Sequence, residues 1–312
     1  MEVCEIPRLD ARAIDAGEEA TMHDLRRGVA EAGFLILRDD AISPAQVEAL
    51  IAAYRRFFAL PEARKREVDM ARTGSNRGWG APRSERVDPG ANPDYKEVFD
   101  CGYELPPGDP WQARALSVYA PNLWPEGLPG FRDTVESYQR DALALSLRLL
   151  RGIARAIGAE PGYFDDKFTR PMALLRANHY PPRPAGAGPR DFGIGAHTDY
   201  GCLTLLATDG RPGLEVMAPD GGWWPVTAPA GAFIVNFGEM LEIWTGGRVR
   251  ATPHRVLGGP DERISVPLFV NPDWDANVAP PGSGKVIRAG PHLERRFRET
   301  YLHLGDPATD GG

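Results

Sequence analysis

The chain has 312 residues, 42% of them hydrophobic, which is enough to bury a full-sized core and lies near the upper limit for one domain. Its formal charge of -7 comes from 43 acidic and 36 basic residues, and the basic residues are scattered, so we expect no nucleic-acid partner. The N-terminus lacks signal-peptide features and no run of about 18 apolar residues occurs, so we expect a cytoplasmic protein without membrane contact.

The N-terminal part of the chain is predicted to be α/β. A helix precedes the short apolar run 34–37, which has the length of a buried strand. Ser43 and Pro44 then resemble an N-cap and a first helical position, and apolar residues recur at spacings of three and four up to Phe58. Residues 70–130 contain Gly, Pro and aromatic residues without a clear period, so we expect loops and short strands around the core.

Two more helices are expected further along the chain. Apolar residues recur every three or four positions from residue 131, and Gly158 ends the pattern, which predicts one long scaffold helix over 131–158. The segment 290–305 has the pattern of a C-terminal helix that could pack back over the sheet.

Between residues 172 and 272 the hydrophobic period changes to two. The predicted strands are separated by Gly, Pro and Asp turns and lie at 172–180, 202–208, 213–217, 232–237, 251–257 and 262–270. This density of short strands favours a jelly roll or another double sheet.

These elements predict a mainly β fold with flanking helices, in the α+β class. We expect a single elaborated domain over residues 1–312, because no linker is rich enough in Gly, Pro or Ser to separate two units. Its parts would be a cap region over 1–130, the scaffold helix, a jelly-roll core over 172–272 and the C-terminal helix.

One pair of residues in the β-rich region has the spacing of metal ligands. A histidine and a carboxylate two residues apart on a strand point to the same side, and His197 and Asp199 have this spacing. The pair alone is weak, because six histidines and 43 acidic residues make one such pair expected by chance. His292 and Glu294 form a second pair, but they fall on a predicted helix, where residues two apart point to different faces.

A third candidate ligand supports the first pair. His254 stands in a predicted strand that ends at the turn 258–261. Two histidines and one carboxylate leave three coordination positions open, which is typical of oxygen-activating iron(II). Thiolate ligands are not expected, because Cys4, Cys101 and Cys202 are far apart and form no C-x-x-C pair.

Polar side chains on two predicted strands suggest an anion-binding site. Arg263 and Ser265 share one face of the strand after the turn, and an inward-facing guanidinium suits bidentate binding of a carboxylate. Arg176, Asn178 and Tyr180 share a face of the strand 172–180. Because both faces of that strand are expected to be covered, these polar groups are expected to bind something.

The motifs resemble those of the iron(II)- and 2-oxoglutarate-dependent dioxygenases of the isopenicillin N synthase-like group, which includes plant flavonoid and gibberellin oxidases. The matching segments cover almost the whole chain in the expected order. They are Gly33-Phe34, Phe57-Phe58, Tyr95-Lys96-Glu97-Val98-Phe99, Asn178-His179-Tyr180-Pro181-Pro182, His197-Thr198-Asp199-Tyr200-Gly201, Gly213-Leu214-Glu215-Val216, His254-Arg255-Val256 and Arg263-Ile264-Ser265.

The resemblance implies a double-stranded β-helix, a metal site and a co-substrate site. Iron(II) would be held by His197, Asp199 and His254, and O2 would be the oxidant. The enzyme would hydroxylate or desaturate a small organic molecule while 2-oxoglutarate is converted to succinate and CO2. The implied 2-oxoglutarate residues are Arg263, Ser265, Tyr180 and Asn178.

The chain also departs from the family pattern. Glu239 and Gly246 stand where Asp and Asn are more usual, and we expect these changes to affect a turn near the metal rather than the ligands. Four further residues are interpreted as lining a substrate pocket, although the aromatic ones could equally be core residues. They are Phe99, Tyr200, Trp79 and Arg176.

Two other hypotheses stay open at this point. An isopenicillin N synthase-like oxidase would use the same iron and the Arg-x-Ser pair without 2-oxoglutarate. A non-catalytic binding protein on the same scaffold is the second alternative, since a fold does not fix a function. For each hypothesis we expect a small-molecule ligand and a monomer or weak homo-oligomer.

Overall fold

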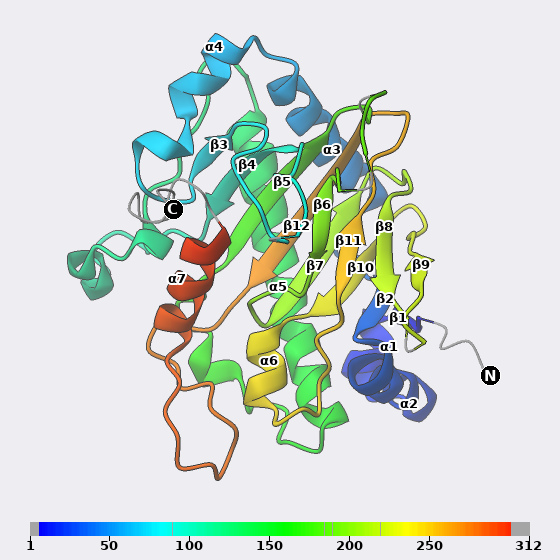
Figure 1. Ribbon diagram of the computed structural model, residues 1–312. Coiled ribbons are helices and arrows are strands. Elements are labelled where there is room, and N and C mark those ends of the chain that lie inside the picture. The colour runs from blue at the N-terminus through cyan, green and yellow to red at the C-terminus, as the bar shows by residue number, and fades with distance from the viewer. Residues whose placement is uncertain (1–5, 89, 184, 189, 219, 301–312) are drawn as a thin grey trace.

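The computed structural model describes residues 6–300, except residues 89, 184, 189 and 219. It contains a large and a small β-sheet, with helices behind the large sheet and at its ends (Figure 1). The strands of the eight-stranded sheet, in spatial order, are β1 (Arg8–Asp10), β2 (Phe34–Arg38), β10 (Ala232–Phe237), β7 (Leu203–Thr208), β12 (Arg263–Val270), β5 (Leu174–Tyr180), β4 (Glu97–Gly102) and β3 (Gly78–Gly80).

The small sheet faces the large one and completes the expected double sheet. Its four strands, in spatial order, are β6 (Ile194–His197), β11 (His254–Val256), β8 (Leu214–Met217) and β9 (Trp223–Pro225). The expected fold class, mainly β with flanking helices, is confirmed by this arrangement. The division into a cap region over 1–130 and a jelly-roll core over 172–272 stays a prediction.

Seven α-helices are present among the described residues. They are α1 (Ala11–Ala16), α2 (Glu19–Arg27), α3 (Pro44–Phe58), α4 (Glu62–Lys65), α5 (Phe131–Ala156), α6 (Glu239–Trp244) and α7 (Ala289–Thr300). The Ser43 hydroxyl caps α3 by accepting a hydrogen bond from the Gln46 backbone N–H, and Pro44 occupies the first turn, as the sequence predicted. None of the described helices combines the length and the apolar composition needed to cross a lipid bilayer.

The apolar core lies between the large sheet and the helices behind it. Helices α3 and α5 direct Phe57, Tyr54 and Phe131 against Phe99 of β4, and these four rings contact one another. The helices therefore cover one face of the large sheet, and the small sheet lies against the other.

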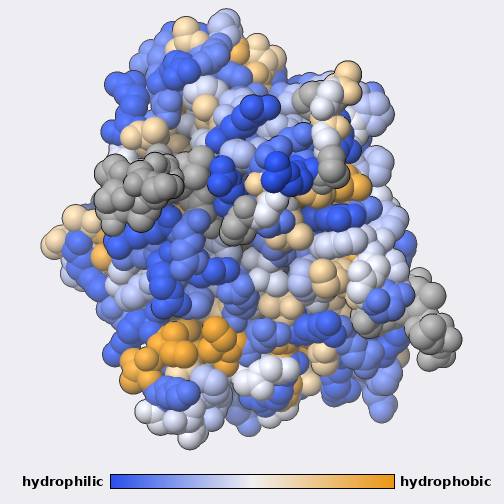
Figure 2. Space-filling model, in the orientation of Figure 1, coloured by the Kyte–Doolittle hydropathy of each residue, from blue (hydrophilic) through white to orange (hydrophobic). Residues whose placement is uncertain are grey.

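The outer surface contrasts with this core. The face drawn in Figure 2 is mostly hydrophilic, with one patch of hydrophobic residues near its lower edge.

Strand β12 connects the core to the space between the two sheets. Ile264, Val266 and Leu268 belong to the apolar core and are fully buried, whereas Arg263 and Ser265 point to the opposite side. The core side chains thereby fix the register that presents the two polar ones.

Leu268→Ala tests this support. The change should lower the free energy of unfolding by roughly 2–5 kcal/mol, because it removes fully buried methyl groups and leaves a cavity. Urea unfolding of the purified variant would measure the loss. Val286→Ala is the control, since Val286 is 65% exposed, and an equal loss in both variants would contradict the role of Leu268.

Candidate active site

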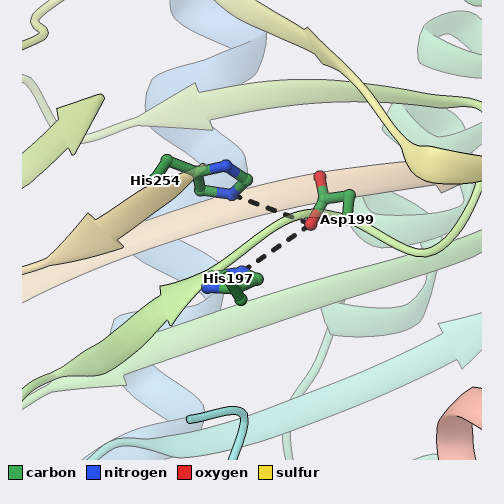
Figure 3. Close-up of side chains that lie close together, drawn as sticks. All are labelled: His197, Asp199 and His254. Atoms are coloured by element: carbon green, nitrogen blue, oxygen red, sulfur yellow. Dashed lines mark ion pairs between the residues drawn. The ribbon is translucent and has the colours of Figure 1, made fainter. Parts of the chain in front are cut away.

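Three side chains converge where the small sheet meets the turn that follows β6. His197 ends β6, His254 begins β11, and the two residues are direct partners in the antiparallel register. The Nε2 atoms of His197 and His254 lie 3.8 and 3.7 Å from the same Asp199 Oδ1 (Figure 3). One ligand atom from each residue lies within 4.8 Å of the other two, which is the compactness that one metal ion requires.

Backbone carbonyls orient both imidazoles. His197 Nδ1 lies 2.8 Å from the Gly195 carbonyl oxygen, and His254 Nδ1 lies 3.1 Å from that of Thr252. A carbonyl only accepts, so each Nδ1 carries the proton and each Nε2 keeps its lone pair toward the carboxylate. Burial and the neighbouring His254 lower the pKa of His197 to about 4, so the ring is neutral at physiological pH.

The carboxylate of Asp199 is held from behind by two donors. Thr204 Oγ1 and Asn236 Nδ2 both donate to Oδ2, the latter over 2.6 Å, which leaves Oδ1 toward the histidines. Burial opposes ionisation, but the two histidines and the two donors outweigh it and lower the pKa of Asp199 below its ordinary value. The group is therefore an ionised, oriented ligand.

The turn that carries Asp199 is fixed by the N-terminus of α6. The backbone N–H groups of Gly238, Glu239 and Met240 donate to the carbonyls of Cys202, Asp199 and Gly201 over 3.0, 2.8 and 3.1 Å. Glu239 therefore lies at the turn beside the candidate ligands, as the sequence predicted. Helix α6 was not predicted, because six residues are too few to show a helical period.

Gly238 cannot carry a side chain at this contact. A Cβ atom there would lie 2.3 Å from the Gly201 carbonyl oxygen and 2.6 Å from that of Asp199. Both oxygens belong to the backbone of the turn, so a larger residue would displace the turn itself.

A cavity of about 380 Å³ opens beside the three residues. At one end it is lined by Arg263, Ser265, Asn178 and Tyr180, which the register of β12 and β5 pairs as Arg263 with Tyr180 and Ser265 with Asn178. The structure thus brings the four predicted co-substrate residues to the cavity that the candidate metal ligands also line.

Arg263 has a buried charge without a carboxylate beside it. The residue is 5% exposed, its Nε donates to the Arg211 carbonyl oxygen over 3.3 Å, and its guanidinium lies over the Tyr180 ring. Within the described part of the chain, Nη1 has no hydrogen-bond partner and no acidic side chain forms an ion pair with it. A buried guanidinium in this state is strongly stabilised by an anionic ligand.

A buried ion network forms another part of the cavity wall. Arg176 of β5 binds both carboxylate oxygens of Asp100 over 2.8 and 2.6 Å and lies 3.0 Å from Glu85. Lys96 pairs with the same Glu85 and lies 3.5 Å from Asp94. Of these residues the sequence proposed only Arg176 for the pocket and named Lys96 only within a motif, because the partners of the network are separated by up to 91 positions.

The aromatic candidates for a substrate pocket divide into two groups. Tyr200 lines the cavity, as does Arg176. Phe99 instead packs against Phe57 with ring centroids 4.7 Å apart, and Trp79 donates its indole N–H to Glu97 over 2.7 Å. Phe99 and Trp79 are fully buried and do not line the cavity. The sequence could not separate them from Tyr200, because aromatic identity alone does not say which face of a strand packs against the core.

The chain is similar to known oxygenases along most of its length. Residues 6–127 match the family model for the N-terminal region of non-haem dioxygenases in morphine synthesis, and residues 171–272 match the 2OG-Fe(II) oxygenase superfamily. The 2-oxoglutarate-dependent dioxygenase tropC of Talaromyces stipitatus is 34% identical over 96% of this chain and 94% of its own length. The homoarginine-6-hydroxylase of Arabidopsis thaliana is 32% identical, over 89% and 83%.

Solved structures share the fold. A full-length Neurospora crassa protein in complex with alpha-KG superposes with a TM-score of 0.83 at 30% identity, covering 96% of this chain and 99% of that chain. The same protein with alpha-KG and thymine gives a TM-score of 0.82 at 30% identity, covering 96% and 100%. The overall fold is therefore shared over nearly the whole of both chains.

The carboxyl group of Asp94 bonds to the backbone of β6, and its protonation should change the stability of the protein with pH. Burial raises the pKa of Asp94 to about 6, against the opposing effect of Lys96, and its Oδ1 accepts the Gly195 N–H over 3.2 Å. A carboxyl whose pKa is raised by folding stabilises the protein at low pH, and this contribution is lost as the pH rises through about 6.

Asp94→Asn should remove that pH dependence. Between pH 4.5 and 7 the stability of the metal-free wild type should fall by about 2 kcal/mol relative to the variant, which keeps the acceptor for Gly195. Urea unfolding at each pH measures the difference. Asp166→Asn is the exposed control, and parallel curves for wild type and Asp94→Asn would contradict the assignment.

Proposed function

Because the chain belongs to the iron(II)- and 2-oxoglutarate-dependent dioxygenases of the isopenicillin N synthase-like superfamily, we propose that His197, Asp199 and His254 hold its iron(II). The protein is an oxidoreductase that uses 2-oxoglutarate and O2 to oxidise a small molecule. Two imidazoles, oriented by backbone carbonyls, and one ionised carboxylate fit this metal, because they leave coordination positions for other ligands. When bound, iron(II) supplies the dioxygen chemistry that protein side chains lack.

The single observation that carries the 2-oxoglutarate site is the buried, uncompensated charge of Arg263. Its planar fork would bind the distal carboxylate of the dicarboxylate, with the Ser265 hydroxyl as a further donor. Tyr180 packs on the guanidinium and would hold it in place, while Asn178 offers its amide nearby. Apolar side chains of the same wall, Leu206, Leu214 and Val256, would exclude water from the ion pair.

The substrate is proposed to lie beside the network of Arg176, Glu85 and Lys96, with Tyr200 as a further wall. A cavity of about 380 Å³ that also holds the co-substrate accommodates only a small substrate, and its charged wall favours polar groups. The relatives support this class, since one is named a homoarginine hydroxylase and another was solved with thymine. We propose hydroxylation of a compact polar molecule as the reaction.

The two alternative hypotheses have less support. The similar relatives are named as 2-oxoglutarate-dependent enzymes, which disfavours an oxidase that does without the oxo acid. The oriented, ionised Asp199 between two imidazoles disfavours a binding protein without catalysis. Cytoplasmic location, absence of a nucleic-acid partner and a monomeric or weakly oligomeric state stay predictions.

Anaerobic titration of the iron(II) protein with 2-oxoglutarate tests the proposal. A weak visible charge-transfer band should appear, and it should be absent in Asp199→Ala because that variant lacks the carboxylate ligand. With O2 admitted, succinate and CO2 should form in equal amounts. Substrate turnover without succinate would favour the oxidase that uses no oxo acid, and iron binding that survives Asp199→Ala would place the metal elsewhere.

Arg263→Gln should weaken 2-oxoglutarate binding at least about 30-fold, or about 2 kcal/mol, because it removes the positive charge opposite the carboxylate. Calorimetric titration of the Mn(II)-loaded protein measures the affinity without turnover. The control is Arg211→Gln, which removes an arginine that pairs with Asp261 outside the cavity and is 46% exposed. Equal affinities for Arg263→Gln and the control would reject the co-substrate site.

A further inference from the structure

Helix α7 forms one side of the substrate cavity. It lies on the same side of the molecule as α6 (Figure 1), and four of its residues line the cavity. They are Leu293, Glu294, Phe297 and Arg298. His292, which with Glu294 mimics the ligand spacing in the sequence, is on this helix and takes no part in the metal cluster.

A chain of contacts connects α7 to the turn that carries Asp199. The Glu239 carboxylate accepts a hydrogen bond from Thr198 Oγ1 over 2.5 Å and a second one from Arg296 Nη2 over 3.3 Å. Thr198 lies between His197 and Asp199 in the chain, so the first hydrogen bond acts on the backbone that joins two proposed ligands.

Arg296 also contacts the other neighbour of Asp199. Its guanidinium lies over the Tyr200 ring, 4.3 Å from the ring centroid, and its Nη1 pairs with Glu299 of the same helix over 2.7 Å. One side chain of α7 therefore reaches Thr198 through Glu239 and Tyr200 directly. The residue between these two attachments is Asp199.

We propose that Arg296 is a positioning residue, which ties the cavity-covering helix α7 to the turn that carries Asp199, so that ligand alignment depends on α7 being docked. The inference rests on the proposed metal site. It extends that site by a residue that is outside the described cavity lining and the candidate ligand cluster and does not belong to the motifs of the resemblance.

The exposure of these contacts separates positioning from general stability. The side chains of Arg296 and Glu239 are each 30% exposed, and ion pairs this accessible to water contribute little to global stability. Removing Arg296 should therefore leave the fold intact but loosen the backbone of the turn that carries Asp199. Groups that orient metal ligands typically change metal affinity by roughly 10–100-fold when lost, and an effect of up to about tenfold is expected one contact further away.

The test compares Arg296→Ala with Arg295→Ala, a control on the same helix that loses the same charge and whose guanidinium lies 3.3 Å from His292 Nδ1 of that helix. Co(II) serves as the metal probe, because its visible absorption reports the ligand set. Arg296→Ala should weaken Co(II) binding by up to about tenfold, shift the Co(II) spectrum and speed amide hydrogen exchange at residues 198–202 and 238–240 in the metal-free protein. Arg295→Ala should match the wild type in all three.

Further variants distinguish the proposed connection from a local effect. Thr198→Val should act like Arg296→Ala, and the double variant should lose no more Co(II) affinity than the larger single loss, because both changes break one connection. Arg296→Lys keeps the charge but not the planar group over Tyr200 and should restore part of the affinity. If Arg296→Ala does not fold, Glu239→Gln serves instead, since it keeps the acceptor for Thr198 and removes the charge that faces Arg296.

The outcomes separate this inference from the proposed function. Normal Co(II) affinity and spectrum in Arg296→Ala, or additive losses in the double variant, would overturn the positioning role while leaving the metal site in place. Failure of the wild-type protein to bind Co(II), or binding that survives Asp199→Ala, would reject the proposed ligands and the inference together.

Discussion

The site depends on the buried Asp199 carboxylate, which must stay ionised and face the two imidazoles although it lies on an irregular turn. Asp199 has no place in a strand ladder, so neighbouring elements must fix it: α6 holds the backbone, Thr204 and Asn236 hold one carboxylate oxygen, and the imidazoles face the other. Removal of any of these groups would leave buried charge or unpaired polar atoms. The large sheet supplies Thr204 from β7 and Asn236 from β10, and it thus supports the proposed metal site although it contributes none of the proposed ligands.

The two charged parts of the cavity illustrate different solutions to burial of an arginine. Arg176 is neutralised within the protein by Asp100 and Glu85, and its geometry is complete before any ligand arrives. Among the described residues, the Arg263 guanidinium contacts a carbonyl oxygen and the face of a tyrosine but no carboxylate, which is why we propose that it binds an anion. The two arginines lie on neighbouring strands of one sheet, so their different partners, not the residue type, distinguish the one proposed to bind an acid.

Long periodic elements and ordered motifs were predictable from the sequence, whereas short elements and distant partners were not. The helices at 44–58 and 131–156 and the alternation on β12 follow their apolar periods. Strand β6, which carries His197, was missed because it has four residues and only one of them is fully buried. The sequence did not predict a role for Glu85 or Asp94 in the site. Their ion pairs with Lys96 and Arg176 form only when the fold brings these distant residues together.

The direct pairing of His197 with His254 has a consequence for how the small sheet assembles. Side chains alternate along a strand, so a slip of one residue between β6 and β11 would turn one imidazole away from the other. Four- and three-residue strands specify register weakly by themselves, and a metal that needs both rings would favour the correct one. The ion would then select the native register during folding, because it would stabilise only those chains in which β6 and β11 have paired in the native alignment.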